Sequence, residues 1–203
     1  YYFHAIAQLG KINKSIVVSV PSGNFGNLTA GLIAKRMGLG IDRFIAATNS
    51  NHSVPDYLTS GYFMESNIVH TISNAMDVAK PSNFSRMLSL YANNHQAMSK
   101  DIAGHWCNEE ETRKAMRLLL DEYNYVSDPH SAIAFDALAK QSNRNEVISI
   151  FLETAHPAKF PEEVEKVSHQ KVEIPEALQQ LFSLQKNATF IPNNYEAFIA
   201  ELK

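Results

Sequence analysis

An apolar segment that leads into a glycine-rich turn and then into a helix constrains this chain more than any other feature. Residues 16–20 read Ile-Val-Val-Ser-Val, which is typical of a buried strand. The turn from Pro21 to Asn27 reads Pro-Ser-Gly-Asn-Phe-Gly-Asn, and residues 28–36 follow with helical periodicity. This order of elements points unpaired backbone N–H groups outward at the positive end of a helix dipole. The segment is therefore a candidate anion site that needs no lysine or arginine.

The same alternation of strand and helix continues along the chain. Residues 44–48 and 147–152 form further apolar runs, and we expect shorter extended segments at 68–72 and 125–126. Continuous apolar strands between helices favour an α/β fold, with an open, mostly parallel sheet and helices on both faces. The expected helices share apolar spacing and turn or capping residues at their ends: 1–9, 26–37, a short helix from 54, 82–93, 108–122, 131–140, 161–168, 175–184 and 193–202.

Composition excludes several classes of function. The 203 residues are 45% hydrophobic, which is enough for a sizeable core. A net charge of −3 without a basic tract argues against nucleic acid, and no apolar run is long enough to span a membrane. The chain has one cysteine, Cys107, which excludes an internal disulfide and a multi-cysteine metal site and fits a cytoplasmic location. We expect Cys107 to pack in the core with Trp106.

The start of the chain is also informative. It opens Tyr1-Tyr2-Phe3 without an initiator methionine or a basic signal-peptide region, and its apolar residues already have helical spacing. We therefore expect the chain to be a piece of a longer protein.

The turn after the first strand has two interpretations. As a phosphate site, its backbone amides bind, Gly23 and Gly26 allow close approach and positive φ, and Asn24 and Asn27 donate hydrogen bonds. As a structural turn, the same residues simply connect a strand to a helix. The segment matches neither the Walker A motif nor Gly-x-Gly-x-x-Gly, so spacing alone leaves both interpretations open.

Two other candidate segments follow strands. Thr154 lies just after the apolar run 147–152, and its hydroxyl faces either a ligand crevice or its own turn. Asp128 and Pro129 form a helix start, with Asp128 as the N-cap, and capping accounts for both. His130 is a weaker candidate for a general base, and His156 and Lys159 are expected to be ordinary loop residues.

Five segments in collinear order resemble threonine synthase, a pyridoxal-phosphate enzyme of the tryptophan-synthase-β-like fold, in its longer bacterial and fungal form. The segments are residues 18–27, 43–49, 73–78, 128–130 and 154–160. The likeness runs from residue 1 to about residue 170. It implies that residues 1–203 are the C-terminal portion of the large, cofactor-binding domain, with 170–203 as a C-terminal segment that wraps the surface. It also implies conversion of O-phosphohomoserine and water to threonine and phosphate.

The resemblance implies roles for individual residues. Thr154 would hydrogen-bond the pyridine nitrogen of the cofactor, and Asn49 and Ser131 would contribute to the substrate site. The residues that would surround the cofactor phosphate share one loop: Ser22 at its edge, then Gly23, Asn24, Phe25, Gly26 and Asn27. A neutral hydroxyl beside the pyridine nitrogen moderates the electron sink and favours β-replacement and β,γ-elimination.

Two features depart from the family pattern. The Schiff-base lysine of the family lies upstream in a Phe-Lys-Asp-like segment, and no such segment occurs here, so we expect this chain alone to be inactive. Some relatives have Asp at the position of Asn27, which can still cap the helix. Strands lacking their usual neighbours would leave edges and apolar faces exposed, so we also expect the isolated chain to self-associate.

Three alternatives remain at this stage. The first is another enzyme of the same fold, such as a threonine dehydratase, a cysteine synthase or a tryptophan synthase β relative. The second is a threonine-synthase-like protein that binds a phosphorylated metabolite without turnover. The third is a nucleotide-binding α/β module, which is disfavoured because no ribose-binding acid stands at the usual distance.

Overall fold

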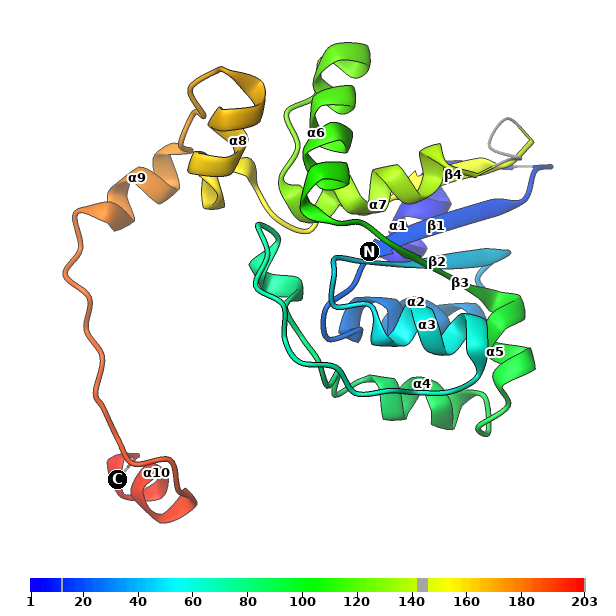
Figure 1. The fold of residues 1–203 in the computed structure, drawn as a ribbon, viewed down its shortest axis with the longest axis horizontal. Coiled ribbons are helices and arrows are strands. Elements are labelled where there is room, and N and C mark those ends of the chain that lie inside the picture. The colour runs from blue at the N-terminus through cyan, green and yellow to red at the C-terminus, as the bar shows by residue number, and fades with distance from the viewer. Residues whose placement is uncertain (12, 142–145, 203) are drawn as a thin grey trace. The chain divides into compact units, whose positions relative to one another are not determined.

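The computed structural model describes residues 1–11, 13–141 and 146–202, which divide into two compact units, Tyr1–Val172 and Glu173–Lys203. The first unit contains a parallel sheet flanked by helices (Figure 1). Its helices, in chain order, are α1 (Tyr2–Gln8), α2 (Gly26–Arg36), α3 (Ser53–Ser60), η1 (Asn74–Met76), α4 (Phe84–Leu90), α5 (His95–Asp101), α6 (Glu109–Tyr123), α7 (Pro129–Ala139), η2 (Pro157–Lys159) and α8 (Pro161–Ser168).

Four strands form the sheet in the order β3-β2-β1-β4. They are β1 (Ile16–Pro21), β2 (Arg43–Thr48), β3 (Ile102–Trp106) and β4 (Ile148–Phe151). Every pair is parallel, and β1 lies between β2 and β4. The carboxyl ends of all four strands therefore meet at one edge of the sheet. This arrangement confirms the expected parallel α/β fold.

Helices cover both faces of this sheet (Figure 1). Val18 and Val20 of β1 point to one face, where they join the core formed with Leu28 and Leu32 of α2. Val17, on the opposite face, packs in a second core with residues of α7. Because successive side chains of a strand alternate between faces, a strand buried on both faces needs the continuous apolar run seen in β1.

Polar side chains cap the N-termini of α6 and α7. The side chain of Asn108 accepts a hydrogen bond from the Glu111 N–H at 2.9 Å, and Glu111 returns one to the Asn108 N–H, which completes a capping box on α6. Asp128 accepts from the N–H groups of His130 and Ser131 at the start of α7, with Pro129 in the first turn.

The second unit contains α9 (Glu176–Phe182) and α10 (Tyr195–Glu201). Neither helix has a buried residue, and Phe190 between them is 96% exposed. Among the described residues of the whole chain, no helix is long and apolar enough to cross a membrane.

The structure differs from the sequence-based expectations in several segments. Residues 68–72 and 125–126 are not strands. The strand β3 and the helix α5 were not expected from the sequence. Trp106 is 42% exposed and stacks on His52 at a centroid distance of 4.4 Å, so only Cys107 of that pair lies in the core. The edge position of β3 leaves one of its faces half-exposed, and its sequence has no continuous apolar run.

Candidate functional site

The loop between β1 and α2 turns sharply at Phe25, which has φ 59° in the left-handed region. Positive φ was expected at Gly23 and Gly26, and this was wrong: Phe25 holds that conformation. For a residue with a side chain, it costs about 1–2 kcal/mol. The Phe25 side chain is 3% exposed and packs in the same core as Leu28, so burial of the ring stabilises the strained backbone.

Gly23 is needed for close approach of two backbone segments. A Cβ added at Gly23 would lie 2.7 Å from the Met76 Cα and 2.8 Å from the Ala75 carbonyl oxygen. The helix η1 therefore packs directly on the loop. At Gly26, an added Cβ would meet only the Asn83 side chain, at 3.4 Å. Gly26 is exposed and stands at the first position of α2, so its open side faces the mouth of the loop.

The N-terminus of α2 has no side-chain cap. The Thr29 N–H bonds to the Phe25 carbonyl at 2.9 Å, whereas the N–H groups of Gly26 and Asn27 have no acceptor in the described part of the chain. Asn27 was expected to cap this helix, and that expectation was wrong. Its Oδ1 instead accepts hydrogen bonds from the Tyr1 and Tyr2 hydroxyls, at 2.9 and 2.8 Å. The amides thus remain available to an anion at the positive end of the dipole.

Residues far along the chain brace the outer side of this loop. The Ser82 N–H donates to Asn24 Oδ1, and Asn83 Nδ2 donates to the Asn24 carbonyl at 2.9 Å. Nothing in the local sequence indicates these partners, because 58 residues separate Ser82 from Asn24. The Ser22 hydroxyl donates back to the Val20 carbonyl at 2.9 Å and is buried. Ser22 thus lies at the edge of the loop with its hydroxyl already bonded.

Thr154 leaves the sheet at the same edge as this loop. In the pairing of β1 with β4, Ser19 lies opposite Phe151, and the Leu152 N–H donates to the Ser19 carbonyl at 3.0 Å. Neighbouring strands lie about 4.8 Å apart, so the segment after Phe151 emerges beside the segment that leads to Ser22. Thr154 is exposed, and its hydroxyl has no partner among the described residues.

The start of α7 holds the Thr154 backbone. The Thr154 N–H donates to Ser131 Oγ at 3.3 Å, and Ser131 Oγ donates to Asp128 Oδ2 at 2.5 Å. Both Ser131 and Asp128 are fully buried. Ser131, expected to contact substrate, therefore also fixes the position of the segment that carries Thr154.

His130, the weaker candidate for a general base, lies at the same helix start. Its Nδ1 lies 2.8 Å from Asp128 Oδ1, and its ring packs against Phe160 at a centroid distance of 4.7 Å. The Nε2 atom is buried and has no hydrogen-bond partner among the described residues. An unpaired buried polar atom costs about 1–3 kcal/mol. We therefore expect this nitrogen to be met by a group outside the described chain.

Asn49, the other expected substrate residue, lies at the centre of a buried hydrogen-bond network at the end of β2. Its Nδ2 donates to the Thr71 hydroxyl and to Asp77 Oδ1, both at 2.8 Å. Its Oδ1 accepts from the Asn51 backbone and side chain. Asn51 also exchanges two hydrogen bonds with the Val69 backbone, and the Thr71 N–H donates to Asp77 Oδ2, so the network holds residues 69–77 against the sheet edge.

A cavity of about 510 Å³ lies beside this network. It is lined by residues 70–72 and Asn74 on one side and by residues 159–163 on the other, with Glu109 also at its wall. Lys159 contributes a cationic side chain to this cavity, whereas His156 serves as a cap: its Nδ1 accepts from the Ala158 N–H at 3.1 Å. Two segments that are far apart in sequence thus form one polar hollow.

Comparison with known proteins shows which family the chain resembles. A family model described as threonine synthase, C-terminal, matches residues 131–201. The threonine synthase of Serratia marcescens is 48% identical over 179 residues, covering 88% of this chain and 41% of the relative. The chain thus spans less than half the length of that relative.

Solved structures extend the match to the fold. The crystal structure of threonine synthase from Escherichia coli superposes with a TM-score of 0.86 at 40% identity, covering 100% of this chain and 47% of that one. A PLP-bound threonine synthase from Brucella melitensis gives a TM-score of 0.84 at 30% identity, covering 100% of this chain and 48% of that one.

Proposed function

Because the chain belongs to the threonine synthase family and matches the C-terminal part of its members, we propose that it supplies one wall of a pyridoxal-phosphate site. The observation that carries the proposal is the shared sheet edge. The uncapped start of α2 and the Thr154 hydroxyl leave the sheet from neighbouring parallel strands, β1 and β4. An anion and a ring nitrogen of one small molecule can then be bound together.

The residues present fit such a cofactor. The Gly26 and Asn27 amides, which have no acceptor among the described residues, suit a phosphate, and the exposed Gly26 leaves room for it. Thr154 offers a neutral hydroxyl that can donate to the pyridine nitrogen. Pyridoxal phosphate, when bound, supplies an electron sink for elimination and replacement at the carbons of an amino acid. Asp128 and Ser131 hold Thr154 in place.

The reaction that we propose for the whole enzyme is the conversion of O-phosphohomoserine and water to threonine and phosphate. The Serratia marcescens and Escherichia coli relatives are named threonine synthases, which supports this reaction over those of other pyridoxal-phosphate enzymes. Asn49 and Ser131 remain proposed substrate contacts. A cytoplasmic location is part of the same proposal and is consistent with the single cysteine.

Calorimetric titration of the chain with pyridoxal phosphate tests this site. We expect saturable binding by the unmodified chain and loss of at least about tenfold in affinity in Gly26→Val, whose side chain would fill the mouth of the loop. Gly40→Ala is the matched control, since an added Cβ there meets nothing within 4 Å. Equal affinity of the unmodified chain and Gly26→Val would contradict the proposal.

The chain alone is expected to lack turnover, because its sequence contains no Phe-Lys-Asp segment. The assay is phosphate release from O-phosphohomoserine by the purified 203-residue chain in the presence of pyridoxal phosphate. Sustained release above the rate without protein would show that this part of the proposal is wrong. If the protein is instead a non-catalytic relative that binds a phosphorylated metabolite, it would bind phosphate at the loop. A longer form of that protein would also release no phosphate from O-phosphohomoserine.

A further inference from the structure

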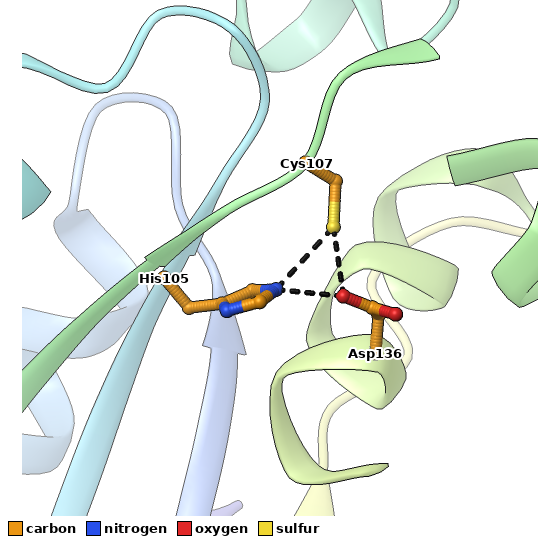
Figure 2. A group of neighbouring side chains, drawn as sticks. All are labelled: His105, Cys107 and Asp136. Carbon is orange, nitrogen blue, oxygen red and sulfur yellow. Dashed lines mark hydrogen bonds and ion pairs between the residues drawn. The ribbon is translucent and has the colours of Figure 1, made fainter. Parts of the chain in front are cut away.

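Three chemically different side chains converge where β3 packs against α7 (Figure 2). His105 lies in β3, and Cys107 follows two residues later, so both side chains point to the same face. Asp136 reaches them from α7. His105 Nε2 lies 2.8 Å from Asp136 Oδ2, and Cys107 Sγ lies 3.3 Å and 3.1 Å from these two atoms.

We propose that His105, Cys107 and Asp136 form a binding site for a divalent transition metal of the zinc class. One imidazole nitrogen, one sulfur and one carboxylate oxygen are the ligand types that Zn²⁺ selects, and all three atoms lie within 4.8 Å of one another. Three protein ligands leave a fourth position of the tetrahedron for water.

The spacing of the donor atoms is close to that of a tetrahedral site. With metal–sulfur and metal–nitrogen bonds of about 2.3 and 2.0 Å, neighbouring ligand atoms stand about 3.3–3.6 Å apart. The observed separations of 2.8–3.3 Å are shorter by a few tenths of an ångström. A difference of this size can be made up by small side-chain rotations.

The partners of the cluster change when a metal enters. In the metal-free chain the Cys107 thiol donates a hydrogen bond to Asp136 Oδ2. On binding, sulfur becomes a thiolate ligand, its proton passes to solvent, and the ion replaces the hydrogen bonds among the three residues. Cys107 is fully buried, while His105 and Asp136 side chains are 18% and 14% exposed, so the ion enters from the His105–Asp136 side.

The positive charge of Lys140 lowers the affinity of the cluster for a metal cation. Its Nζ lies 2.9 Å from Asp136 Oδ2, where a positive charge repels an incoming metal. The Lys140 side chain is 49% exposed and also reaches Glu111 Oε1 at 3.3 Å. It can therefore move to Glu111 when a metal takes Asp136, at a modest cost in affinity.

The experiment is a Co²⁺ titration of the purified full chain, reduced and free of pyridoxal phosphate. Because Cys107 is the only cysteine, a thiolate-to-cobalt charge-transfer band in the near ultraviolet reports this site alone. We expect a band that saturates at one equivalent and is displaced by Zn²⁺. His105→Gln and Asp136→Asn should each weaken binding by about tenfold or more, and Lys140→Met should strengthen it by roughly fivefold.

Absence of the charge-transfer band in the unmodified chain overturns the proposal, as does unchanged affinity in both His105→Gln and Asp136→Asn. Cys107→Ser should lose the band while it keeps its circular dichroism spectrum. Lys140→Met keeps the test decisive if the other variants fail to fold. Its substitution lies on the surface, and we expect it to raise the metal affinity rather than lower it. A band that weakens in Lys140→Met would also count against the site.

Discussion

Phe25 holds the left-handed conformation of the candidate phosphate loop, and Gly23 provides its contact with η1. The sequence indicated the loop and its glycines, but not this division of roles. A glycine is compatible with positive φ and also with close packing, and local sequence does not distinguish the two. The distant partner of Gly23 at residues 75–76 decides between them, and only the folded chain brings that partner near.

Gly23→Ala should lower the free energy of unfolding by about 1–3 kcal/mol, because the new methyl group would overlap the backbone at Met76. Gly40→Ala should change it by less than about 0.5 kcal/mol. Chemical denaturation of both variants provides the measurement. Equal stability of the two would show that η1 does not pack tightly on the loop.

The elements differ in how well sequence patterns predict them. The strands β1, β2 and β4 have apolar runs, and α6 and α7 have capping residues, so each could be predicted from local sequence. The strand β3 reads Ile-Ala-Gly-His-Trp, which has a central glycine and no apolar run. A Cβ at Gly104 would lie 2.7 Å from the Pro55 Cα, so this glycine allows α3 to approach the sheet. Tertiary packing therefore determines β3.

The capping box of α6 should contribute to the stability of the folded chain. Asn108→Ala should reduce the free energy of unfolding by about 1 kcal/mol, since it leaves the Glu111 N–H without its acceptor. Glu110→Gln is the control in the same turn; its side chain is exposed, so its effect should be only a few tenths of a kcal/mol. Thermal denaturation measures both, and a larger loss in the control would contradict the assignment.

The same box should make stability depend on pH. The hydrogen bond from the Asn108 N–H lowers the pKa of Glu111 below its ordinary value of 4.5. A carboxylate with a lowered pKa stabilises the folded state above that ordinary value, and the effect is lost as pH falls through the folded pKa. Glu111→Gln should therefore be less stable than the unmodified chain at pH 7, and the difference should shrink below about pH 4. A stability difference that stays constant across this pH range would show that the Asn108–Glu111 hydrogen bond does not cause the pH dependence.

At the scale of the whole molecule, β4 forms an edge of the sheet within the described residues. An apolar groove of about 560 Å³ lies beside it, lined by Tyr123, Phe135 and Phe151 among others. The Serratia marcescens relative is more than twice as long as the region that it shares with this chain. Exposed apolar faces were expected from the resemblance, whereas the location of this groove required the fold.

Self-association of the chain should follow from this groove. Sedimentation velocity is expected to show dimers or larger species that increase with protein concentration. Tyr123→Glu should shift the distribution toward monomer, because Tyr123 is 63% exposed and a charge there disfavours apolar contact. A chain that remains monomeric at high concentration would show that this surface is not adhesive.

A crystal structure of the chain, or of a longer form of the protein, with pyridoxal phosphate bound would test the proposed cofactor site. We expect phosphate oxygens within hydrogen-bond distance of the Gly26 and Asn27 amides and the pyridine nitrogen beside the Thr154 hydroxyl. A cofactor phosphate bound away from the β1–α2 loop, or a ring distant from Thr154, would contradict it.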